Sequence, residues 1–257
     1  MWENQSLARG VASRADLLDN LLAYWIEDYF KKPGYLKVDG KPVLFVYHLQ
    51  RLLEDLGGVE NTRAALDAMR DRCRKAGFPG VLLLAEYRGD DASFAYCWHT
   101  KQQRPTPREA IARQLDLINL RRTAVDLPFL PTATMGWDPI AWQSDNPKSP
   151  WLNPDKMVRW RLSPKEFQEL LTKVKGVMDS LPASSPGRRM LLLDNWNEWG
   201  EGHVLAPHAG AGFGYLKAVR EVFTRRNNRP DYRSPYELGL GPYDSLYRAQ
   251  PEAGRAR

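Results

Sequence analysis

Short apolar runs that do not alternate with polar residues recur along the chain, and they constrain its fold most. Three of them read VLFVYH at 43–48, VLLLAEY at 81–87 and MLLLDNW at 190–196. A strand with one face in water alternates apolar and polar residues, whereas a parallel strand covered on both faces is apolar throughout. The runs therefore predict buried strands of a parallel sheet.

Segments with helical spacing and clear start signals separate these runs. Residues 13–32 carry apolar side chains three and four positions apart after a capping serine, Ser13. The sequences TPRE at 106–109 and SPKE at 163–166 are both capping boxes with proline at the first helical position. Strands that alternate with amphipathic helices indicate parallel βα units, and hence a doubly wound sheet or a barrel. No glycine-rich phosphate loop follows any run, which counts against a nucleotide-binding doubly wound fold.

We expect 43–47, 81–87, 129–134 and 190–194 to be parallel neighbours in chain order, as in an α/β fold of the (β/α)8 TIM-barrel type. One further run, SFAYCWH at 93–99, also has the composition of a strand, but only a few residues separate it from the second run. A parallel crossover needs a dozen residues or more. Either a helix has been lost here, or one of the two runs is not a regular barrel strand.

The composition narrows the class of protein. Of 257 residues, 43% are hydrophobic and 26% charged, as in a globular protein with a core. We expect no membrane span and no targeting segment, because no long apolar run occurs, and the location stays open between cytoplasm and export. The net charge of +6 comes from scattered arginines, so nucleic acid is not an expected partner. Cys73 and Cys97 lie in unrelated contexts and predict neither a disulfide framework nor a zinc site.

Polar and aromatic residues follow the apolar runs on their C-terminal sides, where the fold alone does not need them. In parallel α/β folds the C-terminal ends of the strands hold the active site. Aromatic rings pack on the apolar faces of sugar rings, while amides and acids bond the hydroxyls, so the pattern predicts a carbohydrate substrate. The residues expected to bind it are Trp2, Asn4, Glu86, Tyr96, Trp98, Trp137, Asp138, Asn195, Trp196, Asn197, Trp199 and His203.

Glu198 and Glu201 are the candidate catalytic pair. If the chain turns helically after the strand, their Cβ atoms lie about 5–6 Å apart. That suits a retaining glycosidase, whose two carboxyls are about 5–5.5 Å apart, whereas an extended backbone would separate them by roughly 10 Å, nearer the inverting range. The alternative is that both are acids at a helix N-terminus, favoured by the helix dipole. That alternative leaves the neighbouring asparagines and tryptophans unexplained.

Two further candidates lie beside this pair. His203 and His208 could suggest a metal site, but they sit in a loop rich in glycine and proline, without the helical placement of metal ligands. We therefore favour loop or substrate-contacting histidines and expect no metal. Asp194 ends the apolar run and is expected only to orient neighbouring Asn or Arg side chains.

The sequence DNWNEWGEGHVLAP at 194–207, followed by FGYLKAVREVF at 213–223, resembles the family 99 glycoside hydrolases and the WbsX-type proteins of bacterial polysaccharide loci. These proteins carry an Asn-Glu-Trp-x-Glu-Gly signature near the end of a (β/α)8 barrel. Weaker similarity runs through YLKVDGKPVLFVY, PTATMGWDP and GLGPYDSLY. The resemblance implies a glycosidase acting on an α-linked, mannan-like polysaccharide or oligosaccharide, without metal or organic cofactor.

The resemblance also implies roles for the two glutamates. Glu198 corresponds to a base that draws the proton from the neighbouring sugar hydroxyl. Glu201 corresponds to the acid that protonates the leaving oxygen and later activates water, so that the intermediate is an anhydro-sugar. The alternatives are a non-catalytic carbohydrate-binding or polysaccharide-assembly protein of the WbsX type, or an inactive truncated product.

The start of the chain bears on how much of the barrel is present. Trp2-Glu3-Asn4 looks like the C-terminal end of an early barrel strand, since relatives carry a similar Trp-x-Asn. The runs amount to about five strands plus that remnant, so we expect an incomplete barrel with roughly the first two or three of eight βα units missing. Residues 1–228 would form the partial barrel, and 229–257 an extension that packs on it and ends in disorder. Open strand edges and an uncovered apolar face on 17–30 predict self-association.

Overall fold

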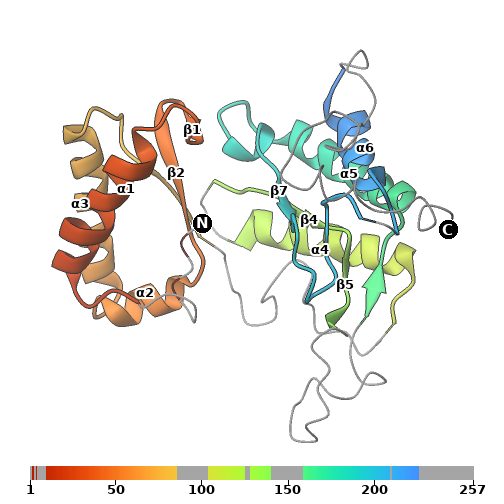
Figure 1. The fold of residues 1–257 in the computed structure, drawn as a ribbon, viewed down its shortest axis with the longest axis horizontal. Helices are drawn as coiled ribbons and strands as arrows, with labels where there is room; N and C mark the ends of the chain where they lie inside the picture. The colour runs from red at the N-terminus through yellow and green to blue at the C-terminus, as the bar shows by residue number, and fades with distance from the viewer. Residues whose placement is uncertain are drawn as a thin grey trace, which may run out of the picture. The chain divides into compact units, whose positions relative to one another are not determined.

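The structure is a computed structural model that describes residues 2, 4, 10–85, 104–124, 128–139, 159–208 and 210–225. The chain divides into two compact units, Met1–Gly89 and Asp90–Arg257 (Figure 1). The predicted strand at 93–99 and the predicted extension at 229–257 lie outside the described residues. None of the helices in the described ranges is long and apolar enough to cross a bilayer.

Unit 1, residues 1–89, is built on a three-stranded sheet. Its central strand is β2 (Lys41–Val46), which is antiparallel to β1 (Lys37–Val38) and parallel to β3 (Leu82–Ala85). Val43 pairs with Leu82 at the start of the parallel register. The first two apolar runs are therefore parallel neighbours, as the sequence predicts.

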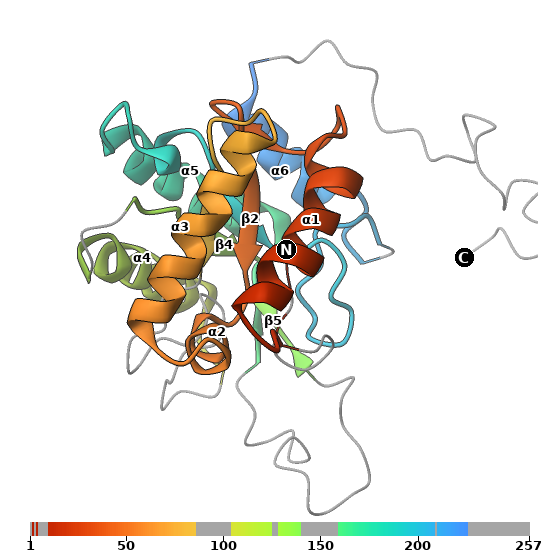
Figure 2. The same ribbon diagram turned by 90° about the vertical axis from the view of Figure 1, so that its left-hand side faces the viewer.

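Helices cover one face of this sheet. α2 (Leu49–Asp55) and α3 (Val59–Lys75) connect β2 to β3, and two views at right angles place α3 and the N-terminal helix on the same side of β2 (Figures 1 and 2). Leu44 and Val46 are buried, whereas Val43 and Phe45, which alternate with them along the strand, are partly exposed. Within the described residues, the expected burial on both faces therefore holds for one face only.

The helix expected over 13–32 is present. It consists of π-helical turns Asp16–Leu21 (η1) and Ile26–Phe30 (η2) with an α-helical turn, Leu22–Trp25 (α1), between them. Ser13 caps it, since its Oγ accepts the N–H of Asp16 at 3.1 Å.

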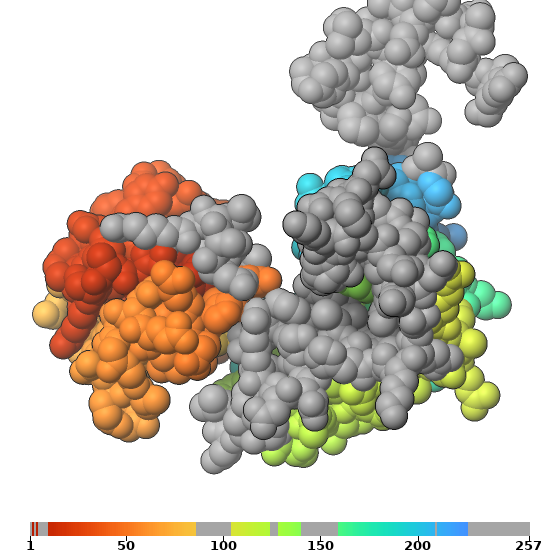
Figure 3. All heavy atoms as spheres, turned by 90° about the horizontal axis from the view of Figure 1, so that it is seen from below, coloured from red at the N-terminus to blue at the C-terminus, as the bar shows by residue number. Residues whose placement is uncertain are grey.

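The apolar side of this helix is buried within unit 1. Leu17, Leu22 and Phe30 are fully buried and form one core with residues of β2, α2 and α3. The space-filling view shows the atoms of this helix, in red, packed directly against those of the orange α2–α3 segment (Figure 3). The expected uncovered helix face is therefore wrong, because the helix packs against its own unit.

Unit 2, residues 90–257, contains two short sheets. β4 (Thr132–Thr134) is parallel to β7 (Leu192–Asp194), as predicted for the third and fourth strands. β5 (Gly136–Trp137) is antiparallel to β6 (Trp160–Arg161). This second pairing is not among the predicted ones, because the predicted third strand ends at residue 134 and no strand is expected near residue 160.

Three long helices surround these strands. They are α4 (Pro107–Ala124), α5 (Pro164–Ser180) and α6 (Gly214–Phe223), and the turn η4 (Pro186–Arg188) follows α5. Both predicted capping boxes form, because Thr106 and Ser163 exchange side-chain and backbone bonds with Glu109 and Glu166.

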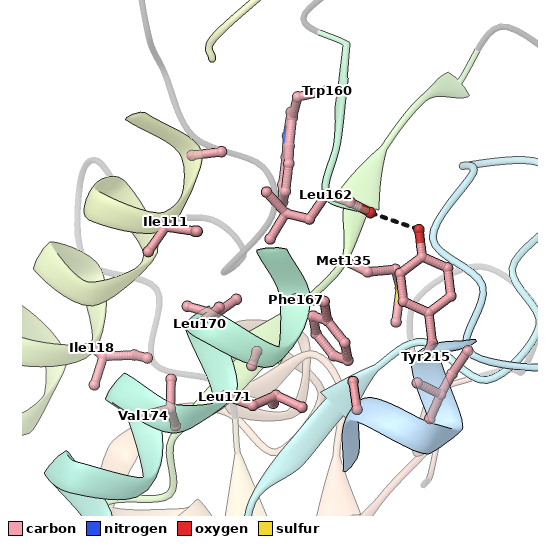
Figure 4. Close-up of a cluster of buried hydrophobic side chains, with 14 of the residues drawn as sticks. Ile111, Ile118, Met135, Trp160, Leu162, Phe167, Leu170, Leu171, Val174 and Tyr215 are labelled. Atoms are coloured by element: carbon pink, nitrogen blue, oxygen red, sulfur yellow. Dashed lines mark hydrogen bonds between the residues drawn. The ribbon is translucent and has the colours of Figure 1, made fainter. Parts of the chain in front are cut away.

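The core of unit 2 lies where α4, α5 and α6 meet β4–β6. Figure 4 shows Phe167, Leu170 and Val174 of α5 among side chains of the other elements. Tyr215 of α6 closes this core, donating its hydroxyl proton to the Leu162 carbonyl at 2.6 Å. This packing fixes β5, β6 and the start of α6, the elements that border the candidate site.

The barrel prediction holds only in part. Helices and parallel strands alternate as expected, and the fold is a mixed α/β fold. The parallel pairs β2–β3 and β4–β7 lie in separate sheets, and the part of the chain that the structure describes forms no closed barrel.

Candidate active site

The loop after β7 turns back on itself. The N–H groups of Leu205 and Ala206 donate to the carbonyls of Asn195 and Trp196, at 2.9 and 2.8 Å. Further out, Glu198 and His203 form an antiparallel bridge. Residues 195–206, called the rim loop below, are therefore a closed hairpin-like turn, and the next helix begins only at Gly214. The alternative that Glu198 and Glu201 are acids at a helix N-terminus is excluded.

Backbone contacts hold the tip of the rim loop against β5 and β6. The N–H of Asp138, directly after β5, donates to the Glu201 carbonyl at 2.7 Å. Arg161 of β6 donates from Nη2 to the Gly202 carbonyl at 2.8 Å. Gly202 has a φ of +71°, and an added Cβ would lie 2.8 Å from both Cβ and O of Asp138. The position thus needs glycine for its conformation and for its close approach.

His203 lies at the centre of the site, between two carboxylates. Its side chain is only 1% exposed. Nε2 is 2.7 Å from Oε2 of Glu201, and Nδ1 is 3.3 Å from Oδ2 of Asp194. The ring of Trp137 lies 5.8 Å away, centre to centre. His203 therefore joins the end of β7 to the rim loop, and its burial keeps it from direct contact with a substrate.

The protonation of this cluster follows from its surroundings. Burial lowers the pKa of His203, but the interactions with Asp194 and Glu201 outweigh it and raise that pKa to about 9. Burial raises the pKa of Asp194, while the interaction with His203 lowers it. At neutral pH, His203 is thus an imidazolium held by two acids. In the described ranges, no group of three or more His, Cys, Asp or Glu residues could hold a metal ion.

Glu198 lies across the turn from this cluster. Residues directly opposite in an antiparallel bridge carry their side chains on the same face, with Cβ atoms about 5 Å apart. Because Glu198 bridges His203, these two side chains start on the same face of the rim loop, and the ring of His203 contacts Glu201. Glu201 is 18% exposed, so its carboxyl can reach His203 and solvent.

The exposed surface of the rim loop is aromatic. Trp196 and Trp199 are 53% and 56% exposed, and Trp199 meets the His208 ring edge-on at 5.9 Å. A cavity of about 80 Å³ opens between Trp199, His208 and Arg161. It holds about two or three waters and is far smaller than the roughly 300 Å³ of a small-molecule site. The cavity is therefore too small to enclose a ligand of that kind.

Other residues predicted to bind substrate have partners in the fold. Trp137 is 7% exposed and packs on His203, and Asp138 holds Arg159 in a two-point ion pair at 2.7 and 3.1 Å. This carboxylate raises the pKa of Arg159. Asn195 accepts the Trp196 N–H at 2.5 Å. Asn197 is exposed beside the two tryptophans, Trp196 and Trp199.

The remaining predicted residues lie elsewhere. Trp2 bridges Val46 in parallel, is 8% exposed and packs on Trp25 at 5.2 Å. Asn4 is fully buried and exchanges two hydrogen bonds with the backbone of His48, at 2.8 and 2.9 Å. Both side chains thus serve the core of unit 1. Glu86, Tyr96 and Trp98 lie outside the described residues.

Three further residues shape the site in ways that the sequence does not indicate. Asp194, expected only to orient Asn or Arg side chains, contacts His203 instead. Arg159 and Arg161 were not singled out, because nothing in the sequence indicates that β6 pairs with β5. One available signal was the position of Asp194, the first charged residue after an apolar run that leads into the motif.

Comparisons with known proteins concern the sequence and the fold of this chain. A family model described as "Glycosyltransferase WbsX" matches residues 116–219. Two proteins called "Uncharacterized protein WxcX", from two strains of Xanthomonas campestris pv. campestris, are each 27% identical over an alignment 256 positions long. The alignment covers 87% of this chain and 34% of theirs. The chain thus spans about a third of the length of these curated relatives.

A solved structure extends the comparison to the fold. It is described as a "Glycoside hydrolase-like protein", and it aligns with a TM-score of 0.51 and 16% identity over 83% of this chain and 62% of its own. At that identity the similarity concerns the fold alone. The sequence resemblance to the WbsX-type and glycoside hydrolase-like proteins is therefore confirmed, by the WbsX family model over residues 116–219 and by the fold.

Proposed function

We propose that this protein is a retaining glycoside hydrolase that acts on an α-linked, mannan-like polysaccharide or oligosaccharide. Glu198 is the base and Glu201 the acid/base. The observation that carries the proposal is that Glu201 contacts the ring of the buried His203 while Glu198 pairs with the His203 backbone, on the rim loop that follows a parallel strand. This is the strand end at which α/β folds carry their chemistry.

The reaction divides between the two carboxyls. Glu198 takes the proton of the neighbouring sugar hydroxyl, and the freed oxygen attacks the anomeric carbon as the glycosidic bond breaks. Glu201 gives a proton to the departing oxygen, leaving an anhydro-sugar. Water then opens that ring while Glu201 recovers a proton from it, and Glu198 returns its proton to the sugar oxygen. Two displacements give net retention, in keeping with the short carboxyl separation expected of a retaining pair.

The two tryptophans supply the sugar-binding surface. Trp196 and Trp199 present more than half of their surface to solvent, which is unusual for side chains of this size. Exposed indole faces beside acids and amides suit sugar rings, whose apolar faces stack while their hydroxyls bond. This observation also favours a second candidate, a protein that binds carbohydrate without cleaving it.

The test uses the full chain and two substrates, an α-mannan oligosaccharide and an aryl α-glycoside with a good leaving group. Glu201→Gln should slow the oligosaccharide by about 10²–10⁴-fold and the aryl glycoside far less, because an activated leaving group needs no proton. Glu198→Gln should slow both, because the sugar hydroxyl then lacks its base. Glu221→Gln, on the exposed side of α6, is the matched control and should change neither.

Product analysis separates the candidate functions. Hydrolysis yields a shorter sugar with retained configuration, which NMR of the first product detects. The family model is named for glycosyl transfer, so a parallel reaction with a second sugar as acceptor tests whether elongated products form. Binding to the same oligosaccharide without any turnover, and loss of that binding in Trp199→Ala, would instead favour the sugar-binding protein. Full hydrolysis by Glu198→Gln would refute the assignment of the base.

A further inference from the structure

His203 has contacts that substrate binding does not explain. Its ring is 1% exposed and lies between Oδ2 of Asp194 and Oε2 of Glu201, at 3.3 and 2.7 Å. A sugar-binding histidine would present a ring nitrogen to solvent, whereas both nitrogens here face protein carboxylates. The residue that His203 touches on the solvent side is Glu201, the acid of the proposed reaction.

We propose that His203, backed by Asp194, is a positioning residue that stores the proton which Glu201 delivers to the leaving oxygen and recovers from water. The inference rests on the proposed function and adds the source of the proton. In the first step, the Nε2 proton of His203 moves to Oε2 of Glu201, and Glu201 delivers one proton to the leaving oxygen, which leaves a neutral imidazole and a carboxylate. In the second step, Glu201 takes a proton from the attacking water and returns one proton to Nε2, which restores the imidazolium.

The charges around the ring support an imidazolium as the resting form. Asp194 faces it from β7 and Glu201 from the same loop, while Glu198 pairs with the His203 backbone across the bridge. The nearby cations have other partners, because Arg159 pairs with Asp138 and Arg161 bonds the Gly202 carbonyl. Trp137 of β5 contributes only its neutral ring. Two acids thus face one base, which favours its protonated form over the penalty of burial.

The proton held by His203 matters because a glutamic acid without such a partner has lost its own proton at neutral pH. An ordinary glutamic acid has a pKa of about 4.3, so it is almost fully ionised at neutral pH, and its acid form falls about tenfold for each further pH unit. A coupled His–Glu pair titrates as a unit. It keeps one proton until the pKa of His203, raised to about 9, is reached. The acid step should therefore stay independent of pH through the neutral range.

The first test is the imidazole nitrogen spectrum of the full chain, which contains four histidines. One signal, absent in His203→Gln, should remain that of an imidazolium up to a pH of about 9. Asp194→Asn and Glu201→Gln should each lower its titration midpoint by more than one pH unit. A His203 signal that is neutral at pH 7.5 would overturn the proposal whatever the activity.

The second test is the pH profile of kcat/KM on the unactivated oligosaccharide, corrected for the folded fraction. His203→Gln keeps a side-chain N–H for Glu201 but cannot store a proton. The ratio of wild type to variant should grow about tenfold per pH unit, hence about 100-fold from pH 6.5 to 8.5. His48→Gln, the same change at the N-cap of α2, should give a profile parallel to wild type.

The outcomes separate this inference from the proposed function. A His203→Gln profile parallel to that of wild type would show a merely structural histidine and overturn the proton store, while the glutamate assignments could stand. A wild-type chain that hydrolyses no glycoside would refute the proposed function, and with it the delivery step. A small acid added to the solution should raise kcat/KM of His203→Gln at alkaline pH and leave that of wild type unchanged. That result would support His203 as the proton store.

Discussion

Replacing Gly202 by alanine is the sharpest test of how the rim loop is held. Gly202 has a φ of +71°, a conformation that costs a residue with a Cβ about 1–2 kcal/mol. The new methyl group would also lie 2.8 Å from Cβ and from the carbonyl oxygen of Asp138. The carbonyl oxygen belongs to the main chain and Cβ is bonded directly to it, so no side-chain rotation can move either atom away. The N–H of Asp138 also bonds the Glu201 carbonyl, so the loop cannot move without losing that bond.

The structure offers a control in the same unit, Gly212. Its φ of +51° is also left-handed, but an added Cβ meets no atom within 4 Å. Gly212→Ala should therefore lose only the conformational term, about 1–2 kcal/mol of unfolding free energy. Gly202→Ala should lose that and a further 1–3 kcal/mol or so for overpacking. The difference between the two variants isolates the contact with Asp138.

Urea unfolding of both variants, followed by tryptophan fluorescence and far-ultraviolet circular dichroism, measures these losses. Coincidence of the two probes checks that a single transition is being compared, because a chain of two units can unfold in steps. Gly202→Ala should also disturb the His203 titration, since Glu201 precedes the altered residue. Equal losses in the two variants would refute the reasoning, because the contact with Asp138 would then contribute nothing.

Further predictions concern pH, the core and association. The pKa of His203 in the folded protein, about 9, lies above its ordinary value of 6.5. Its contribution to the free energy of unfolding, roughly 3 kcal/mol, is therefore fully present below pH 6.5 and is lost as the pH rises through 9. Urea unfolding of wild type and His203→Gln at pH 6 and pH 10 checks this. Gln114→Leu should destabilise the protein by about 2–4 kcal/mol, because the N–H and C=O of Thr134 both bond this buried amide. Thermal unfolding measures the loss, with Gln168→Leu on α5 as the control. Self-association through open strand edges stays a prediction, and a monomer by light scattering at all concentrations would contradict it.

Local chemistry made the helices the most predictable part of the fold. The capping boxes at Thr106 and Ser163 set the starts of α4 and α5, since each satisfies its backbone donors with residues no more than three positions away. The parallel pairs also followed from sequence, because the non-alternating apolar runs require sheet neighbours and covering helices. The antiparallel pair β5–β6 did not. Its two strands are two residues long and more than twenty positions apart, so contacts with the rest of unit 2 decide their pairing.

Two buried amides, those of Gln114 and Asn4, bear on whether the burial of a polar side chain can be predicted from sequence. Gln114 lies three positions after Ile111 and four before Ile118, on the apolar stripe of α4. A polar side chain at such a position must find a buried partner, and Gln114 bonds the backbone of Thr134. In unit 1, the buried amide of Asn4 likewise bonds the backbone of His48. Sequence can flag such positions by their place on an apolar face, but it cannot name the partner, because the partner is distant along the chain.

The spacing of Glu198 and Glu201 shows why the site itself was harder to predict. A spacing of three residues predicts one helical turn, with both side chains pointing the same way. In the structure, the same residues lie on a tight turn that closes by the bridge to His203, and Gly202 provides the left-handed residue at its tip. The pair is thus organised by His203, not by helical periodicity. Because His203 lies in a stretch rich in glycine and proline, its sequence neighbours suggest an exposed loop, whereas Trp137 and Asp194 bury it from other strands. The chemistry of the motif therefore depends on contacts that only the folded strand ends can supply.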